Sequence, residues 1–126
     1  MLFSRLLERD YTPAHGGNRE DPAPYVVRFS PLTSGEYAGL LGTMQAMARH
    51  AEMSEAEQLS AVQMWDEATA AALEHIIAVR DLLDERGEPV SIGRFKGAAL
   101  KTLELRAELA HAALAFGSLD DDEGKA

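Results

Sequence analysis

The side chains that could carry acid–base or metal chemistry are scattered through this chain. Its four histidines are His15, His50, His75 and His111. None of them stands in the H-x-x-x-H or H-E-x-x-H spacing that places two imidazoles on one helix face. No serine has a G-x-S-x-G setting, and Gly16-Gly17 is not followed by the Lys-Ser or Lys-Thr of a phosphate loop. These residues predict a protein that is not an enzyme and that holds no cofactor or metal.

Cysteine is absent from the sequence, so a disulfide framework and a thiolate zinc site are excluded. The start of the chain, Met1 to Asp10, is too charged for the apolar centre of a signal peptide. No apolar run approaches the roughly 18 residues that cross a bilayer. We therefore expect a cytoplasmic protein without a membrane partner.

The 126 residues suffice for one domain with a modest core. The formal net charge is −9, and residues 52–88 carry most of it, with 10 acidic and 2 basic side chains. Because such a surface repels a phosphate backbone, we expect no nucleic-acid partner. Two interpretations of the acidic middle stay open. It is either a solvated face that keeps the protein soluble or a surface that faces a basic partner.

The N-terminal quarter of the chain predicts little regular structure. Residues 2–10 have the spacing of a short amphipathic helix, and 12–24 hold three prolines and two glycines, which is typical of a linker or long loop. The β-branched and aromatic run at 25–29 is the best strand candidate. We expect its partner at 77–83 or at 90–92.

Two capping boxes indicate where helices begin. Thr33 with Glu36, and Ser54 with Glu57, have the spacing in which a hydroxyl and a carboxylate satisfy free backbone N–H groups. They predict helices over 34–51 and 55–79. The second helix has an apolar stripe that we expect to be buried: Leu59, Val62, Trp65, Thr69, Leu73 and Ile76.

The predicted fold class is mainly α, a small three-helix domain with a minor N-terminal β element. A third helix is expected over 95–116, ending at Gly117, a common residue just past a helix C-terminus. The domain would span 25–119, after a short helix and a linker at 1–24. The like-charge run in 120–126 predicts a disordered acidic C-terminal tail.

The last helix has two apolar faces on opposite sides. One consists of Leu100, Leu103, Ala107, Ala110 and Leu114. The other consists of Leu105, Leu109, Ala112 and Phe116, and we interpret it as a partner-binding face. Met64 is a further candidate, because it points away from the stripe of its own helix and packing does not explain it. The alternative is a central helix that buries both faces in the core.

The order of the elements forms a pattern of its own: a strand-like Val26-Val27-Arg28, the segment Pro31 to Tyr37, a helical middle that carries Trp65 and runs into Ile76-Ile77, the turn Asp84 to Val90, and a last helix reaching Ala115-Phe116-Gly117 before the acidic tail. Over 25–123 this order resembles the tail assembly chaperones of long-tailed bacteriophages and of related prophage or gene-transfer particles. Members of that family are small, acidic and mostly helical. They bind the long helical tape measure protein and keep it soluble while tail tube subunits polymerise around it.

The resemblance implies a non-enzymatic chaperone in the cytoplasm of a bacterial host, with the tape measure protein or another phage structural protein as its partner. An apolar helix face left over for a partner, a high net charge and the lack of a catalytic motif agree with this function. Two alternatives stay open. One is a structural subunit of a phage particle, such as a head–tail connector or tail component. The other is a small helical adaptor or regulatory protein that forms a homo-oligomer by dimerising through the last helix.

Overall fold

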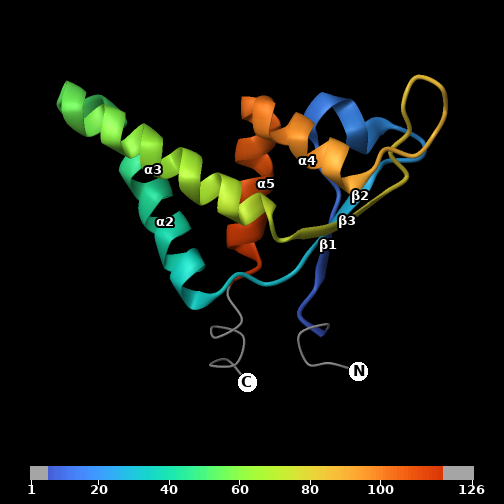
Figure 1. The fold of residues 1–126 in the computed structure, drawn as a ribbon, viewed down its shortest axis with the longest axis horizontal. Coiled ribbons are helices and arrows are strands. Elements are labelled where there is room, and N and C mark those ends of the chain that lie inside the picture. Colours follow the sequence, from blue (N-terminus) through green and yellow to red (C-terminus); the bar gives the residue numbers. More distant parts are fainter. Residues whose placement is uncertain (1–5, 118–126) are drawn as a thin grey trace.

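The computed structural model describes residues 6–117, and the fold is mainly α with a small antiparallel sheet. In Figure 1, α2 and α3 lie on one side, the strands and α4 lie on the other, and α5 stands between them. The elements are β1 (Arg9–Tyr11), η1 (His15–Glu20), β2 (Val26–Phe29), α2 (Ser34–Ala48), η2 (His50–Glu52), α3 (Glu55–Leu73), β3 (Ile76–Arg80), α4 (Ile92–Lys101) and α5 (Leu103–Ala115). The predicted fold class, mainly α with a minor N-terminal β element, is confirmed. The predicted acidic tail lies outside the described residues.

The three strands form one sheet in the order β1-β2-β3, with antiparallel neighbours. Val27 and Phe29 of the central strand β2 are buried. Arg28 between them is exposed, and its Nε lies 2.8 Å from the carboxylate of Asp10 on β1. This alternation of buried and exposed side chains is the period of two that a half-buried strand requires. The strand predicted at 25–29 is therefore confirmed.

Both predicted capping boxes are present. The Thr33 hydroxyl accepts a hydrogen bond from the Glu36 backbone N–H at 3.1 Å, and the Glu36 carboxylate accepts one from the Thr33 N–H at 3.0 Å. Ser54 and Glu57 repeat the arrangement at 3.3 and 3.2 Å. Because each box satisfies two free donors at a helix start, α2 and α3 begin where the sequence predicts.

α3 ends at Leu73 rather than at the predicted residue 79. The following β-branched residues leave the helix and pair with β2, with Val79 opposite Val27 and Ile76 opposite Phe29. A strand that completes a sheet and buries Ile76 outweighs the helical spacing of the same residues. Of the two strand partners expected from the sequence, the segment near 77–83 is thus the one used.

The last helix, predicted as one element, is divided at Thr102 into α4 and α5. Thr102 has an extended backbone (φ −109°, ψ 97°), and its hydroxyl donates to the Ala98 carbonyl at 2.9 Å. The Arg106 guanidinium donates to the Leu100 carbonyl at 3.2 Å, which satisfies an acceptor that the end of α4 leaves free. Four α-helices, not three, therefore form the described domain.

Arg106 is a buried charged residue, and it joins α5 to α3. Its Nε donates to the Thr69 hydroxyl at 2.7 Å, and Nη2 lies 2.9 Å from the Asp66 carboxylate and also donates to the Asp66 carbonyl. The guanidinium lies over the Trp65 ring, 5.1 Å from its centre. One side chain thus connects the middle of α3 with the start of α5 and the end of α4.

Residues 9–20, which include most of the predicted linker, pack against the rest of the described chain, while residues 2–5 of the predicted short helix lie outside the described residues. Residues 9–11 are a strand, and the loop that follows is fastened to α5 by Glu108. This carboxylate accepts hydrogen bonds from the Tyr11 hydroxyl and from the backbone N–H groups of Ala14 and His15. Burial raises the pKa of Glu108, but these bonds outweigh it and hold the pKa below its ordinary value. A proline-rich stretch can pack in this way because side chains satisfy its backbone.

We predict that Arg106→Ala lowers the free energy of unfolding by about 3 kcal/mol, because it removes several charge-assisted hydrogen bonds and leaves buried acceptors without donors. Arg94 is the matched control, since it is an exposed arginine paired with Asp84 at 3.5 Å. Its replacement by Ala should cost no more than about 0.5 kcal/mol. Urea denaturation followed by circular dichroism measures both values. Equal losses for the two variants would contradict the central role of Arg106.

Candidate partner-binding surface

The structure corrects the predicted partner face of the last helix. Leu105, Leu109 and Ala112 are buried. Phe116 is partly buried against the core, with its ring edge-to-face with Phe29 at a centroid distance of 5.8 Å. The physical reason is the place of α5 between the sheet and the α2–α3 pair, so that two sides of one helix are covered. α5 is therefore the central helix of the alternative interpretation, and these four residues offer no apolar face to a partner.

An apolar surface lies instead on the N-terminal half of α3. Leu59 is 64 % exposed, Val62 43 % and Met64 52 %. Met64 is the one predicted partner-binding residue that the structure leaves accessible. Leu59 and Val62 were expected in the buried stripe, and that prediction is wrong. Trp65 of the same stripe is half-buried beneath Arg106 rather than part of the main core.

The geometry of α3 explains this exposure. In Figure 1 the N-terminal half of α3 extends past the core as an arm, accompanied by α2. Ala61 is buried on this arm, and the Gln58 side chain donates to the His50 carbonyl at 3.0 Å. The arm, residues 55–67 of α3, is therefore held against η2 and α2 on one side, while no element within residues 6–117 covers Leu59 and Val62 on the other.

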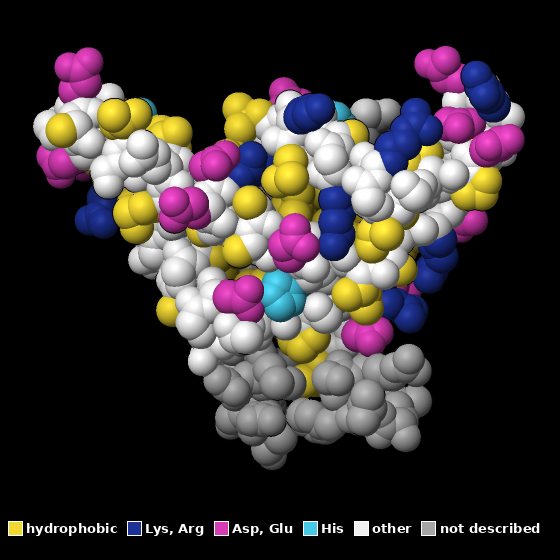
Figure 2. All heavy atoms as spheres, in the orientation of Figure 1, with side chains coloured by type: hydrophobic (Ala, Val, Ile, Leu, Met, Phe, Trp, Pro, Cys, Tyr) yellow, Lys and Arg dark blue, Asp and Glu magenta, His cyan; other side chains and the backbone are white. Residues whose placement is uncertain are grey.

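Two shallow hollows adjoin Leu59 and Val62. The first, about 560 Å³, is lined by His50, Glu55, Ala56, Gln58, Leu59 and Val62. The second, about 440 Å³, is lined by Val62, Gln63, Asp66 and Glu67. Because Val62 belongs to both, they form one strip along α3. Figure 2 shows hydrophobic and acidic side chains together on this arm and a notch between the arm and the middle of the molecule.

Other large apolar side chains are also exposed, among them Leu83 in the loop after β3 and Leu103 at the start of α5. Single exposed apolar residues are normal on a soluble protein and carry no argument alone. The arm differs because Leu59 and Val62 share one face of α3 and line the same hollow, whereas the exposed Met64 lies on the other side of this helix. This grouping makes the arm the candidate partner-binding surface.

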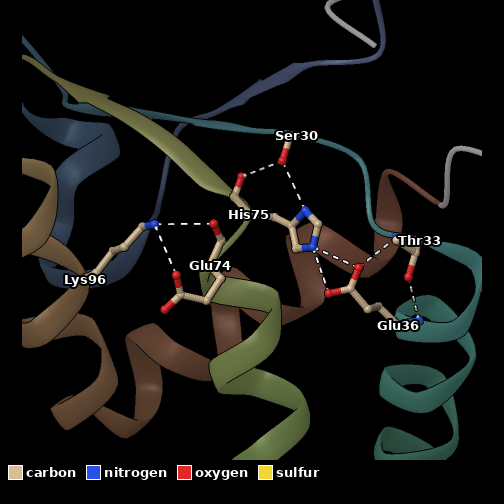
Figure 3. A network of polar contacts seen from close by, with 6 residues as sticks. All are labelled: Ser30, Thr33, Glu36, Glu74, His75 and Lys96. Atoms are coloured by element: carbon tan, nitrogen blue, oxygen red, sulfur yellow. Dashed lines mark hydrogen bonds and ion pairs between the residues drawn. The ribbon is translucent and has the colours of Figure 1, made fainter.

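The structure also assembles a polar network that the sequence did not indicate. His75 lies between Ser30 and Glu36, with Nδ1 3.1 Å from the Ser30 hydroxyl and Nε2 2.9 Å from the Glu36 carboxylate (Figure 3). With the ring proton on Nε2, the imidazole donates to Glu36 and accepts from Ser30. His75 lies 39 residues after Glu36 and 45 after Ser30, and no local motif joins it to them, so sequence reasoning could not find the group.

The contacts of this network are those of a structural joint. The Ser30 hydroxyl has a second acceptor in the His75 carbonyl at 3.3 Å, and the Ser30 backbone N–H donates to the same carbonyl at 2.8 Å. The Glu36 carboxylate is occupied by the capping box of α2. The network therefore ties the loop after β2 to the junction of α3 and β3, and its polar atoms already have partners without a substrate.

Within residues 6–117 no group of three or more His, Asp or Glu side chains could hold a metal ion. None of the described helices is both long and apolar enough to pass through a bilayer. Comparison with protein-family models, with curated proteins and with solved structures finds no match to this chain.

The Glu36 carboxylate predicts a pH dependence of stability. Burial raises its pKa, but hydrogen bonds from His75 and Thr33 outweigh it and hold the pKa below the ordinary 4.5. A depressed folded-state pKa gives stability that is present above 4.5 and is lost as the pH falls through the folded value. Glu36→Gln keeps a capping acceptor but removes the charge, so the variant should have a lower melting temperature than the parent at neutral pH. The difference should vanish in acid, and an equal difference in acid would contradict the assignment.

The burial of α5 makes a second prediction. Leu105→Gln/Leu109→Gln removes two core side chains and buries two amides, each of which costs on the order of 1–3 kcal/mol beyond the lost packing. The domain should lose its cooperative unfolding transition, because the total approaches the whole stability of a small domain. Circular dichroism and sizing chromatography measure this. A folded double variant would restore the partner-face interpretation.

Proposed function

We propose that this chain is a non-enzymatic phage tail assembly chaperone that binds the helical tape measure protein and keeps it soluble in the cytoplasm of the bacterial host. The observation that carries the proposal is the arm, where Leu59, Val62 and Met64 are exposed on a helix that extends past the core. The order of elements that resembles the family supports it. The arm replaces the last helix as the surface that we assign to the client.

The arm has the properties that a holding chaperone requires. Apolar surface removed from water contributes about 25 cal/mol per Å², so a few hundred Å² give useful affinity. The capping box at Ser54 and the contact of Gln58 with His50 hold α3 in place before a client arrives, which lowers the entropy cost of binding. The surrounding carboxylates keep the loaded complex soluble.

The proposal is tested by co-expression with the tape measure protein of the same genome. The wild-type chain should raise the soluble fraction of the client. The triple variant Leu59→Gln/Val62→Gln/Met64→Gln should lower that fraction to near the level without chaperone, because it removes the apolar contact and leaves the backbone of α3 unchanged. Leu83→Gln is the matched control, since Leu83 is 59 % exposed but belongs to the loop after β3, which lies on the opposite side of the molecule from the arm (Figure 1).

Circular dichroism should show that the triple variant keeps its helix content, because none of the three side chains is buried. A client that is equally insoluble with and without the wild-type chain would overturn the proposal. A stable ring or dimer of the chain that neither binds nor solubilises the client would support a structural subunit or an adaptor instead.

A further inference from the structure

The strip along the arm has the length and shape of a binding site for one helix. Glu55, Leu59, Val62 and Asp66 follow each other at spacings of four, three and four residues, so they share one face of α3. At a rise of 1.5 Å per residue the strip is about 17 Å long, or three helical turns. Its centre is apolar, and the hollows on either side of Val62 leave room for side chains of a partner.

The partner cannot add to this surface as a strand. The backbone N–H and C=O groups in the middle of α3 are bonded within the helix, so no free edge exists for main-chain pairing. A helix recognises such a surface through its side chains, by placing an apolar ridge against the exposed row of another helix. The geometry therefore selects a helical segment.

The charges beside the strip indicate the sign of the charge that the partner carries. Glu55 and Glu67 border the hollows, and neither makes an ion pair with a described residue. Asp66 is already neutralised by the buried Arg106 at 2.9 Å. No lysine or arginine lines either hollow. The apolar centre is thus bordered by carboxylates whose natural complements are Lys and Arg.

The same charges argue against a second copy of this chain. In a two-fold dimer across the strip each patch would face itself. Glu55 and Glu67 of one copy would then lie near the same carboxylates of the other, within a segment that carries 10 acidic and 2 basic side chains. Like charges at an interface core cost binding energy and suppress the wrong pairing.

We infer that the Leu59–Val62 strip of α3 binds an amphipathic helix of a partner protein whose apolar stripe is flanked by Lys and Arg. This inference rests on the proposed function and deepens it, because it names the chemical class of the client segment that the arm receives. Leu59 and Val62 contact the stripe of the client helix, and Glu55 and Glu67 pair with its flanking cations.

Three labelled synthetic helical peptides test the inference by fluorescence anisotropy. The first has leucines on one stripe and lysines elsewhere, the second replaces every lysine by glutamate, and the third scrambles the first so that no stripe remains. The stripe-and-lysine peptide should bind the wild-type chain, and the other two should bind at least about tenfold more weakly. Leu59→Gln/Val62→Gln should weaken the first peptide by at least about tenfold, while Leu83→Gln should bind it like the wild type.

A charge-reversed variant, Glu55→Lys/Glu67→Lys, gives an independent readout. It should lose its preference for the lysine peptide and gain affinity for the glutamate peptide. Unchanged binding of the lysine peptide by Leu59→Gln/Val62→Gln would overturn the inference, because it would show attraction by charge alone. Equal binding of the lysine and glutamate peptides by the wild type would also overturn it.

The outcome separates this inference from the proposed function. If the wild-type chain solubilises the tape measure protein and Leu59→Gln/Val62→Gln does so equally well, the strip is not the client-binding site, although the proposed function is supported. If the wild type binds the lysine peptide through the strip but leaves the tape measure protein insoluble, the strip is a helix-binding site and the proposed function fails.

Discussion

The structure depends on one buried arginine. Arg106 is the point at which α3, α4 and α5 meet, since it bonds the Thr69 hydroxyl, the Asp66 carboxylate and the Leu100 carbonyl. A guanidinium without these partners would be very costly at this depth, so the three helices can take no other arrangement that leaves it unpaired. The angle of the arm relative to α5 follows from the same contacts. The surface that we assign to the client is therefore positioned by this polar constraint in the middle of α3 together with the packing of the arm on α2.

The parts of the fold that sequence reasoning placed correctly are those decided locally. The capping boxes at Thr33 and Ser54 fixed the start of α2 and α3, because their bonds span only three residues. The strand at β2 was recognisable from its β-branched and aromatic run. Element ends were less predictable. Ile76 and Val79 fit a helix by spacing, and only the presence of β2 beside them makes the extended form better. Thr102 breaks the last helix for a similar reason, since the acceptor freed at Leu100 is satisfied by a side chain of the next helix.

The candidate surface could not be placed from the sequence, because an amphipathic pattern does not say what covers it. Leu105 and Leu109 have the appearance of surplus apolar surface, yet α5 lies between two layers that cover both sides. Leu59 and Val62 have the appearance of core, yet α3 has 19 residues and α5 has 13, so part of α3 extends past its neighbour. Met64, which departs from the stripe of its own helix, is exposed. The composition of residues 52–88 showed an excess of acidic side chains, but it did not show that some of them, such as Glu55, border an apolar strip.

The bond between Tyr11 and Glu108 joins residues that are 97 positions apart, and it bears on how the chain acquires its fold. Contacts between distant residues require a large loop to close before they contribute, and they slow folding relative to local contacts. On a ribosome the α2–α3 pair can associate early, because its residues are neighbours in sequence. The strand β1 can pair with β2 earlier, but the loop after it can be fastened by Glu108 only once α5 has been synthesised. The arm would thus exist during synthesis before this loop is held, and the last step of folding would be the joining of the N-terminal loop to the C-terminal helix.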